Sequence, residues 1–217
     1  MIVTIDGPAG AGKSSVAQAL AQRLGFEFLD TGAMYRAVTL AALRRKLDLS
    51  DQTAIAQLLQ TIHLDMPGNR VILNGEDIST AIRTPEVTVA SGAIASSKIV
   101  RTTLVGWQRE IAAGRDIVSE GRDQGTLVFP DALCKFFLIA DPVERARRRQ
   151  RQLAAAGTTI ALDEILAAQN ARDARDAARD LAPMVPAADA IQLDSTALSL
   201  EEVVRRMEDE VRRRIGT

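Results

Sequence analysis

One stretch near the start of the chain decides the fold: Gly7-Pro8-Ala9-Gly10-Ala11-Gly12-Lys13-Ser14. It reads G-x-x-x-x-G-K-S, a pattern typical of phosphate-binding loops. An apolar run with strand character at 2–5 precedes it, and a helical pattern over 15–24, ended by Gly25, follows it. Strand, glycine-rich loop and helix in this order favour a phosphate site over a glycine-rich turn without chemistry.

The residue types of this loop suit a triphosphate. Glycines let the backbone approach a phosphate closely, and the N–H groups of the loop and of the following helix end point at the anion. We expect Lys13 to reach the β- and γ-phosphates and the Ser14 hydroxyl to hold Mg²⁺. The predicted triphosphate-binding residues are Gly7, Pro8, Ala9, Gly10, Ala11, Gly12, Lys13, Ser14 and Ser15.

Composition narrows the class of protein. The 217 residues are 47% hydrophobic but only 3% aromatic, so the core must be built mainly of aliphatic side chains. A net charge of −1 gives the protein no overall electrostatic attraction to nucleic acid or to a membrane surface. The single cysteine, Cys134, excludes an internal disulfide and fits a reducing cytoplasm. A strand at the very start leaves no room for a signal peptide, so we expect a cytoplasmic protein.

Strand and helix patterns alternate along the chain. This alternation predicts an α/β fold of the P-loop NTPase type, a five-stranded, mainly parallel sheet with helices on both faces. Asn74-Gly75, after an apolar run, predicts a hairpin and hence a small β-containing insertion. Ser50 is expected to cap a helix over 53–62. The core strands are predicted near 2–6, 27–30, 117–120, 135–140 and 190–193.

A phosphate loop alone does not distinguish a kinase from a motor, a switch or a transporter. A kinase needs an acceptor pocket at the strand ends and arginines to neutralise the transferred group. Thr31 and Arg36 follow the second strand, and Arg122-Asp123 follows the third. These positions fit an acceptor pocket, although a salt-bridged loop would also explain the Arg-Asp pair.

Two arginine-rich helical patterns are ambiguous when read from the residues. Arg172, Asp176 and Arg179 share one helix face, which fits either a phosphate and ribose site or a surface ladder of ion pairs. The run at 145–151 fits a lid arginine that reaches the γ-phosphate, but a solvated face is the better interpretation for any one member.

The residues alone leave open other functions for the protein: a kinase for UMP, AMP or shikimate, a nucleotide-gated switch, and a nucleic-acid-binding ATPase.

Taken together, these features resemble the bacterial cytidylate kinases, within the nucleoside monophosphate kinases, over essentially the whole chain. Two of the stretches that carry this resemblance, Leu29–Arg36 and Gly121–Ala132, are specific to that family, whereas the phosphate loop is not. The blocks that carry the resemblance are Ile5–Ser14, Leu29–Arg36, Gly121–Ala132, Arg172–Asp176, Ala182–Ala190 and Leu193–Thr196.

The resemblance implies transfer of the ATP γ-phosphoryl group to CMP or dCMP with Mg²⁺, giving CDP or dCDP and ADP. It implies one domain over 1–217, with a monophosphate-binding insertion at 61–96 and a lid at 148–178. The protein would be a monomer, and its partners would be nucleotides. Lys13, Arg122 and Arg179 would be catalytic. The CMP pocket would be lined by Thr31, Arg36, Arg101, Arg122, Asp123, Arg172, Asp176 and Arg179.

Within that implied pocket, Arg36 and Arg101 would grip the acceptor phosphate, and Asp123 would accept from the cytosine amine. The chain departs from the family pattern at two positions. Gly92 stands where the family usually has a base-contacting Ser, and Glu120 stands where Asp is more usual.

Overall fold

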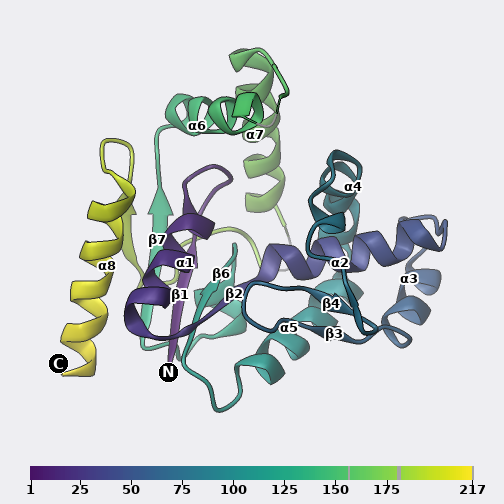
Figure 1. The fold of residues 1–217 in the computed structure, drawn as a ribbon, viewed down its shortest axis with the longest axis horizontal. Coiled ribbons are helices and arrows are strands. Elements are labelled where there is room, and N and C mark those ends of the chain that lie inside the picture. Colours follow the sequence, from purple (N-terminus) through teal and green to yellow (C-terminus); the bar gives the residue numbers. More distant parts are fainter. Residues whose placement is uncertain (156, 180–181, 217) are drawn as a thin grey trace. The chain divides into compact units, whose positions relative to one another are not determined.

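A computed structural model describes residues 1–155, 157–179 and 182–216. The chain divides into two compact units (Figure 1). The first combines Met1–Glu27 with Asp116–Thr217, and the second is Phe28–Arg115.

The first unit holds most of the large sheet and the helices that surround it. Its elements are β1 (Ile2–Asp6), α1 (Lys13–Leu24), β6 (Ile117–Glu120), the π-helical turn η2 (Gln124–Val128), β7 (Cys134–Ile139), α6 (Pro142–Ala155), α7 (Leu162–Ala177), β8 (Ile191–Asp194) and α8 (Leu200–Ile215). Strand β2 (Glu27–Asp30) crosses the boundary. The second unit contains α2 (Thr31–Arg44), α3 (Gln52–Leu59), β3 (Leu64–Asp65), β4 (Ile72–Leu73), β5 (Glu76–Asp77), the 3₁₀ turn η1 (Ala81–Arg83), α4 (Pro85–Ser96) and α5 (Lys98–Ala112).

The five-stranded sheet has the order β2-β6-β1-β7-β8. Strand β1 lies between β6 and β7 and is parallel to both, with Val3 opposite Val118 on one side and Cys134 on the other. Val3 and Ile5, on one face of β1, and Thr4, on the other, are all fully buried, as a strand covered on both faces requires. The five strands and the α/β class are confirmed, and the phosphate loop leaves the C-terminal end of the central strand.

Helices α1 and α8 pack against each other, and α1 also contacts β6. Helix α8 begins with the capping box that the sequence predicts, because the Ser199 hydroxyl accepts from Glu202 N–H and the Glu202 carboxylate accepts from Ser199 N–H. Among the described residues, no helix combines the length and the apolar character that a membrane span requires.

The second unit carries a separate antiparallel sheet of order β3-β4-β5. Asn74 and Gly75 connect β4 to β5 with φ values of 49° and 84°, the left-handed backbone that a two-residue hairpin turn needs. The predicted hairpin is therefore confirmed. The sheet lies within the range 61–96 predicted as an insertion, whose bounds stay a prediction.

The predicted cap of the third helix is wrong. The carboxylate of Asp51, not the Ser50 hydroxyl, accepts from the N–H groups of Thr53 and Ala54. Ser50 instead donates its hydroxyl to Asp48 at 2.7 Å. An aspartate and a serine side by side are both good N-caps, and the sequence pattern does not rank them.

Candidate active site

The phosphate loop begins at a glycine that no other residue could replace. Gly7 has φ +140°, and a Cβ there would lie 2.1 Å from the Leu138 carbonyl oxygen of β7. At the other end of the loop, Gly12 has φ +96° and precedes α1, which no described side chain caps. The first-turn N–H groups of α1 are therefore available to an anion, as the sequence predicts.

Lys13 lies in this loop and is buried. Its ammonium nitrogen donates to the Pro8 carbonyl at 2.8 Å, so the side chain folds back over the loop. Burial, and secondarily the charge of Arg122, lower the pKa of Lys13 to about 7. A bound triphosphate would favour the charged form, because an opposite charge at contact distance raises the pKa of an amine.

Ser14 and Glu120 form an oxygen pair beside Lys13. The Ser14 hydroxyl donates to Glu120 Oε1 at 2.5 Å, joining the start of α1 to the end of β6. Among the described residues, no three His, Cys, Asp or Glu side chains form a metal cage. Mg²⁺ in phosphoryl-transfer sites is held by one or two protein oxygens together with substrate phosphates. The Ser14 and Glu120 oxygens fit that mode of binding.

Asp6, at the end of β1, is a positioning group to which the sequence alone assigns no role. Its two carboxylate oxygens accept from the backbone N–H groups of Gln124, at 2.9 Å, and Gly125, at 2.8 Å. These N–H groups begin η2, directly after Arg122 and Asp123. The sequence signal for this role is an aspartate between an apolar strand and the phosphate loop. The sequence does not show its partner, because Gln124 lies 118 residues away.

Burial raises the pKa of Asp6 to about 6, although the two backbone N–H groups partly offset it. Folded Asp6 thus keeps its proton to higher pH than the unfolded chain does, so its contribution to stability falls as the pH rises from about 4 to about 6. We expect the wild type to lose on the order of 2 kcal/mol relative to Asp6→Asn over that range. Urea unfolding of both proteins at several pH values measures this difference, and a constant difference would contradict the prediction.

Asp176 gathers three predicted site residues around one buried carboxylate. Arg122 Nε donates to Asp176 Oδ2 at 3.0 Å, and Arg179 forms an ion pair with Asp176 Oδ1. Arg172 Nε lies 4.0 Å from the same carboxylate. Because the Asp176 side chain is only 5% exposed, this cluster is not a surface ladder. Asp123, also buried, precedes η2, and its carbonyl accepts from the N–H groups of Leu127 and Val128.

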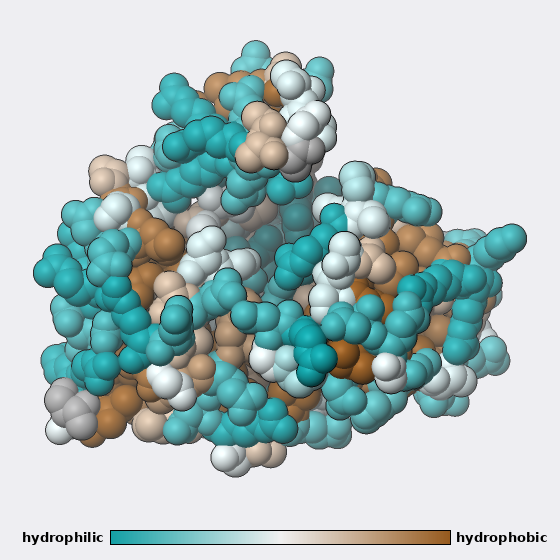
Figure 2. Space-filling view, in the orientation of Figure 1, coloured by the Kyte–Doolittle hydropathy of each residue, from teal (hydrophilic) through white to brown (hydrophobic). Residues whose placement is uncertain are grey.

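The arginines of α6 divide into two groups. Arg145 and Arg148 turn toward the loop: Arg145 Nη1 donates to the Ala9 carbonyl at 2.8 Å, and Arg148 Nη1 lies 3.4 Å from the Ala11 carbonyl. Arg148 also donates to the Ser195 carbonyl at 2.6 Å. The remaining three arginines, Arg147, Arg149 and Arg151, are exposed. The side of α6 that is visible in Figure 2 is mainly hydrophilic.

The second unit carries the other predicted acceptor residues. Thr31 is buried at the start of α2, and Arg36 Nη2 donates to Asp30 Oδ2 at 3.0 Å. Asp30 also caps α2 by accepting from Ala33 N–H. Arg101 is buried on α5, a helix that packs against α2. Asp30, which orients Arg36, was not predicted.

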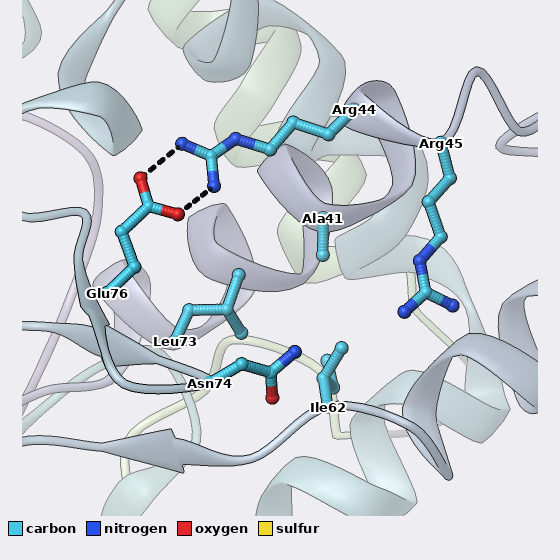
Figure 3. A pocket seen from close by; sticks show the side chains of 7 residues that line it. All are labelled: Ala41, Arg44, Arg45, Ile62, Leu73, Asn74 and Glu76. Carbon is cyan, nitrogen blue, oxygen red and sulfur yellow. Dashed lines mark hydrogen bonds and ion pairs between the residues drawn. The ribbon is translucent and has the colours of Figure 1, made fainter.

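The second unit has a small hollow of about 160 Å³ (Figure 3). A bidentate ion pair between Arg44 and Glu76 crosses its edge. It includes none of the predicted site residues. The residues that line it are Ala41, Arg44, Arg45, Ile62, Leu73, Asn74 and Glu76.

Comparison with known proteins identifies the family. The family model described as cytidylate kinase matches residues 3–213. A cytidylate kinase of Rhodopirellula baltica is 51% identical over 203 residues, covering 94% of this chain and 89% of the relative. A cytidylate kinase of Geobacter sulfurreducens is 47% identical, covering 99% of this chain and 94% of the relative.

A crystal structure of a protein from Eubacterium ventriosum aligns with a TM-score of 0.53 and 11% identity, covering 97% of this chain and 98% of its own. That likeness concerns the fold alone. The match to the family model and the level of identity to the two relatives, over nearly the full length of the chain, show that it belongs to the cytidylate kinase family.

Proposed function

We propose that this protein transfers the γ-phosphoryl group of ATP to CMP or dCMP, giving ADP and CDP or dCDP. The observation that carries the proposal is the placement of Lys13, Arg122 and the Asp176 cluster in one unit around the phosphate loop. Arg122 is near enough to Lys13 to lower its pKa and also holds Asp176. Such a concentration of cations suits two substrates that both carry phosphate.

Phosphoryl transfer depends on placement and charge neutralisation more than on a protein base. The attacking group is an oxygen of the acceptor phosphate, which is already anionic near neutral pH. Lys13 would neutralise the transferred group from the loop side, and Arg122 and Arg179 would neutralise it from the acceptor side. In-line transfer then needs no side chain that removes a proton.

The acceptor roles follow from the same chemistry. Arg36 and Arg101 would bind the CMP phosphate, because a guanidinium meets phosphate oxygens in a planar fork. Asp123 would accept from the cytosine amine. The remaining proposed contacts, to the sugar and the phosphate, come from Thr31, Arg122, Arg172, Asp176 and Arg179.

Mg²⁺ is the divalent metal that we propose, with Ser14 and Glu120 as the groups that would hold it. When bound, it would neutralise phosphate charge. We further propose that the enzyme is a cytoplasmic monomer whose partners are nucleotides, with neither nucleic acid nor a membrane as a ligand. The range 148–178 would form its lid, within which residue 156 lies outside the described residues.

A panel of acceptors tests the proposal. Coupled release of ADP would be measured with CMP, dCMP, UMP, AMP and shikimate, and with no acceptor. We expect CMP and dCMP to give the highest kcat/KM and the reaction without acceptor to be far slower. A higher kcat/KM for another acceptor would identify a different kinase. Hydrolysis that no acceptor accelerates would favour a nucleotide-gated switch.

Gly92 offers a test of base recognition within that panel. It lies exposed on α4, and a Cβ there would meet nothing within 4 Å. Gly92→Ser should therefore fold normally and restore the hydroxyl that the family usually carries there. We expect kcat/KM for CMP to rise about 2- to 10-fold, the effect of one added hydrogen bond, with that for UMP unchanged.

The matched control for this substitution is Gly106→Ser. Gly106 also lies in a helix, α5, and a Cβ there also meets nothing within 4 Å. Both substitutions should stabilise the protein by roughly 0.5 kcal/mol, because serine is a better helix former than glycine. Equal changes in CMP use by the two variants would refute a specific role for position 92.

A further inference from the structure

One residue of the phosphate loop, Ala9, is held through both of its backbone polar groups. The Ala9 N–H donates to Asp173 Oδ1 at 3.1 Å, and the Ala9 carbonyl accepts from Arg145 Nη1 at 2.8 Å. The same nitrogen of Arg145 donates to Asp173 Oδ2 at 2.5 Å. Arg145 and Asp173 therefore bind each other and both polar groups of one residue, and we call this arrangement the Ala9 clasp.

The clasp joins four parts of the first unit. Arg145 comes from α6, Asp173 from α7 and Ala9 from the loop, and Arg145 Nε also donates to the Ala140 carbonyl just after β7. The two side chains are only 6% and 16% exposed. A buried ion pair is tolerated when the remaining hydrogen-bonding groups are satisfied, and here the loop backbone helps to satisfy them.

Gly10 shows how closely the two helices approach the loop. It has φ +78°, and a Cβ there would lie 2.7 Å from Gln169 Nε2 of α7 and 3.2 Å from the Arg145 Cβ. Gln169 Nε2 in turn lies 3.4 Å from the Arg145 carbonyl. The absence of a side chain at position 10 thus lets α6 and α7 rest directly on the loop.

We propose that Arg145 and Asp173 are positioning residues for ATP: they hold the Ala9 backbone so that the other N–H groups of the loop converge before the triphosphate arrives. The inference rests on the proposed ATP role of residues 7–15 and adds two residues to which that proposal gives no part. A loop ordered in advance spares the ligand the entropy of ordering it. Without the clasp, ATP must order the loop when it binds.

Asp173→Asn tests this inference, because asparagine keeps the size of the side chain and removes the charge that pairs with Arg145. We expect the KM for ATP to rise about 10-fold, the lower end of what a hydrogen bond to a charged group contributes. The KM for CMP should stay within about twofold. Asp173→Glu, which keeps the charge, should recover part of the loss.

Two further variants separate positioning from folding. Asp163→Asn makes the same chemical change at an exposed site on the same helix and should leave both KM values unchanged. Arg145→Gln should raise the KM for ATP as Asp173→Asn does, and the double variant should be little worse than either, because both break one unit. A lowered Tm with an unchanged KM for ATP in Asp173→Asn would overturn the proposal.

An exchange measurement tests the clasp without relying on activity. In nucleotide-free protein, the Ala9 amide hydrogen should exchange at least about 10-fold faster in Asp173→Ala than in the wild type, while the core amides of β1 stay protected. Equal exchange at Ala9 would overturn the clasp. A wild type that fails to phosphorylate CMP would instead refute the proposed function, so the two failures are distinguishable.

Discussion

Replacing Lys13 with methionine should reduce kcat by at least about 10³-fold while the protein remains folded. The methionine keeps the aliphatic stem of the side chain but removes the amine that would neutralise the transferred phosphoryl group. Interactions made mainly in the transition state have effects of this size in phosphoryl transfer. The measurement is the rate of CMP-dependent ADP release at saturating ATP and CMP.

The fold should tolerate this change because the Lys13 amine is buried, and burying its charge lowers the free energy of unfolding. We expect the Tm of Lys13→Met to equal or exceed that of the wild type. Lys98→Met, at an exposed position at the start of α5, is the control and should retain full activity. Near-normal turnover in folded Lys13→Met would refute the role of the phosphate loop in catalysis.

Asp123→Asn should lower kcat/KM for CMP by about 10- to 100-fold. An ionised carboxylate accepts a hydrogen bond from the cytosine amine and repels the O4 carbonyl of uracil, and a hydrogen bond to a charged group contributes about 1.5–3 kcal/mol. The asparagine amide can donate to O4, so the preference for CMP over UMP should fall with it. Kinetics with each acceptor at saturating ATP measure both effects.

ATP binding is the internal reference for this variant, because Asp123 belongs to the acceptor side in the proposed site. The dissociation constant of an ATP analogue should change by less than about twofold. Asp131→Asn, a nearby exposed substitution, should leave CMP use intact. Equal losses for ATP and CMP in Asp123→Asn would indicate general damage to the segment after β6 rather than a loss of cytosine recognition.

Local patterns predict the phosphate loop, the five strands and the hairpin at Asn74-Gly75 because each depends on residues close together in sequence. A two-residue turn is encoded within about ten residues, and the strand-loop-helix order within about twenty-five. The order of the strands is not encoded in this way. That β1 lies between β6 and β7 follows from packing across more than a hundred residues.

The same reasoning explains which site residues escaped prediction. Asp173 lies among alternating charges on α7, and nothing in the sequence distinguishes it from a solvated aspartate. Asp6 and Asp30 each orient a neighbouring segment through contacts that only the fold creates. In α6, Arg145 and Arg148 lie three residues apart on the side facing the loop, a periodicity that a run of arginines conceals.

The lowered basicity of Lys13 has a consequence for chemical labelling. The chain has lysines only at 13, 46, 98 and 135, and Lys135 is engaged by both carboxylate oxygens of Asp189. Burial lowers the pKa of Lys13 to about 7, so in neutral buffer more of its amine is in the uncharged, nucleophilic form than for an exposed lysine. An adenosine derivative bearing an electrophile such as a sulfonyl fluoride in place of the phosphates should therefore acylate or sulfonylate this one lysine. Lys13 is therefore the residue on which we expect a covalent inhibitor to anchor.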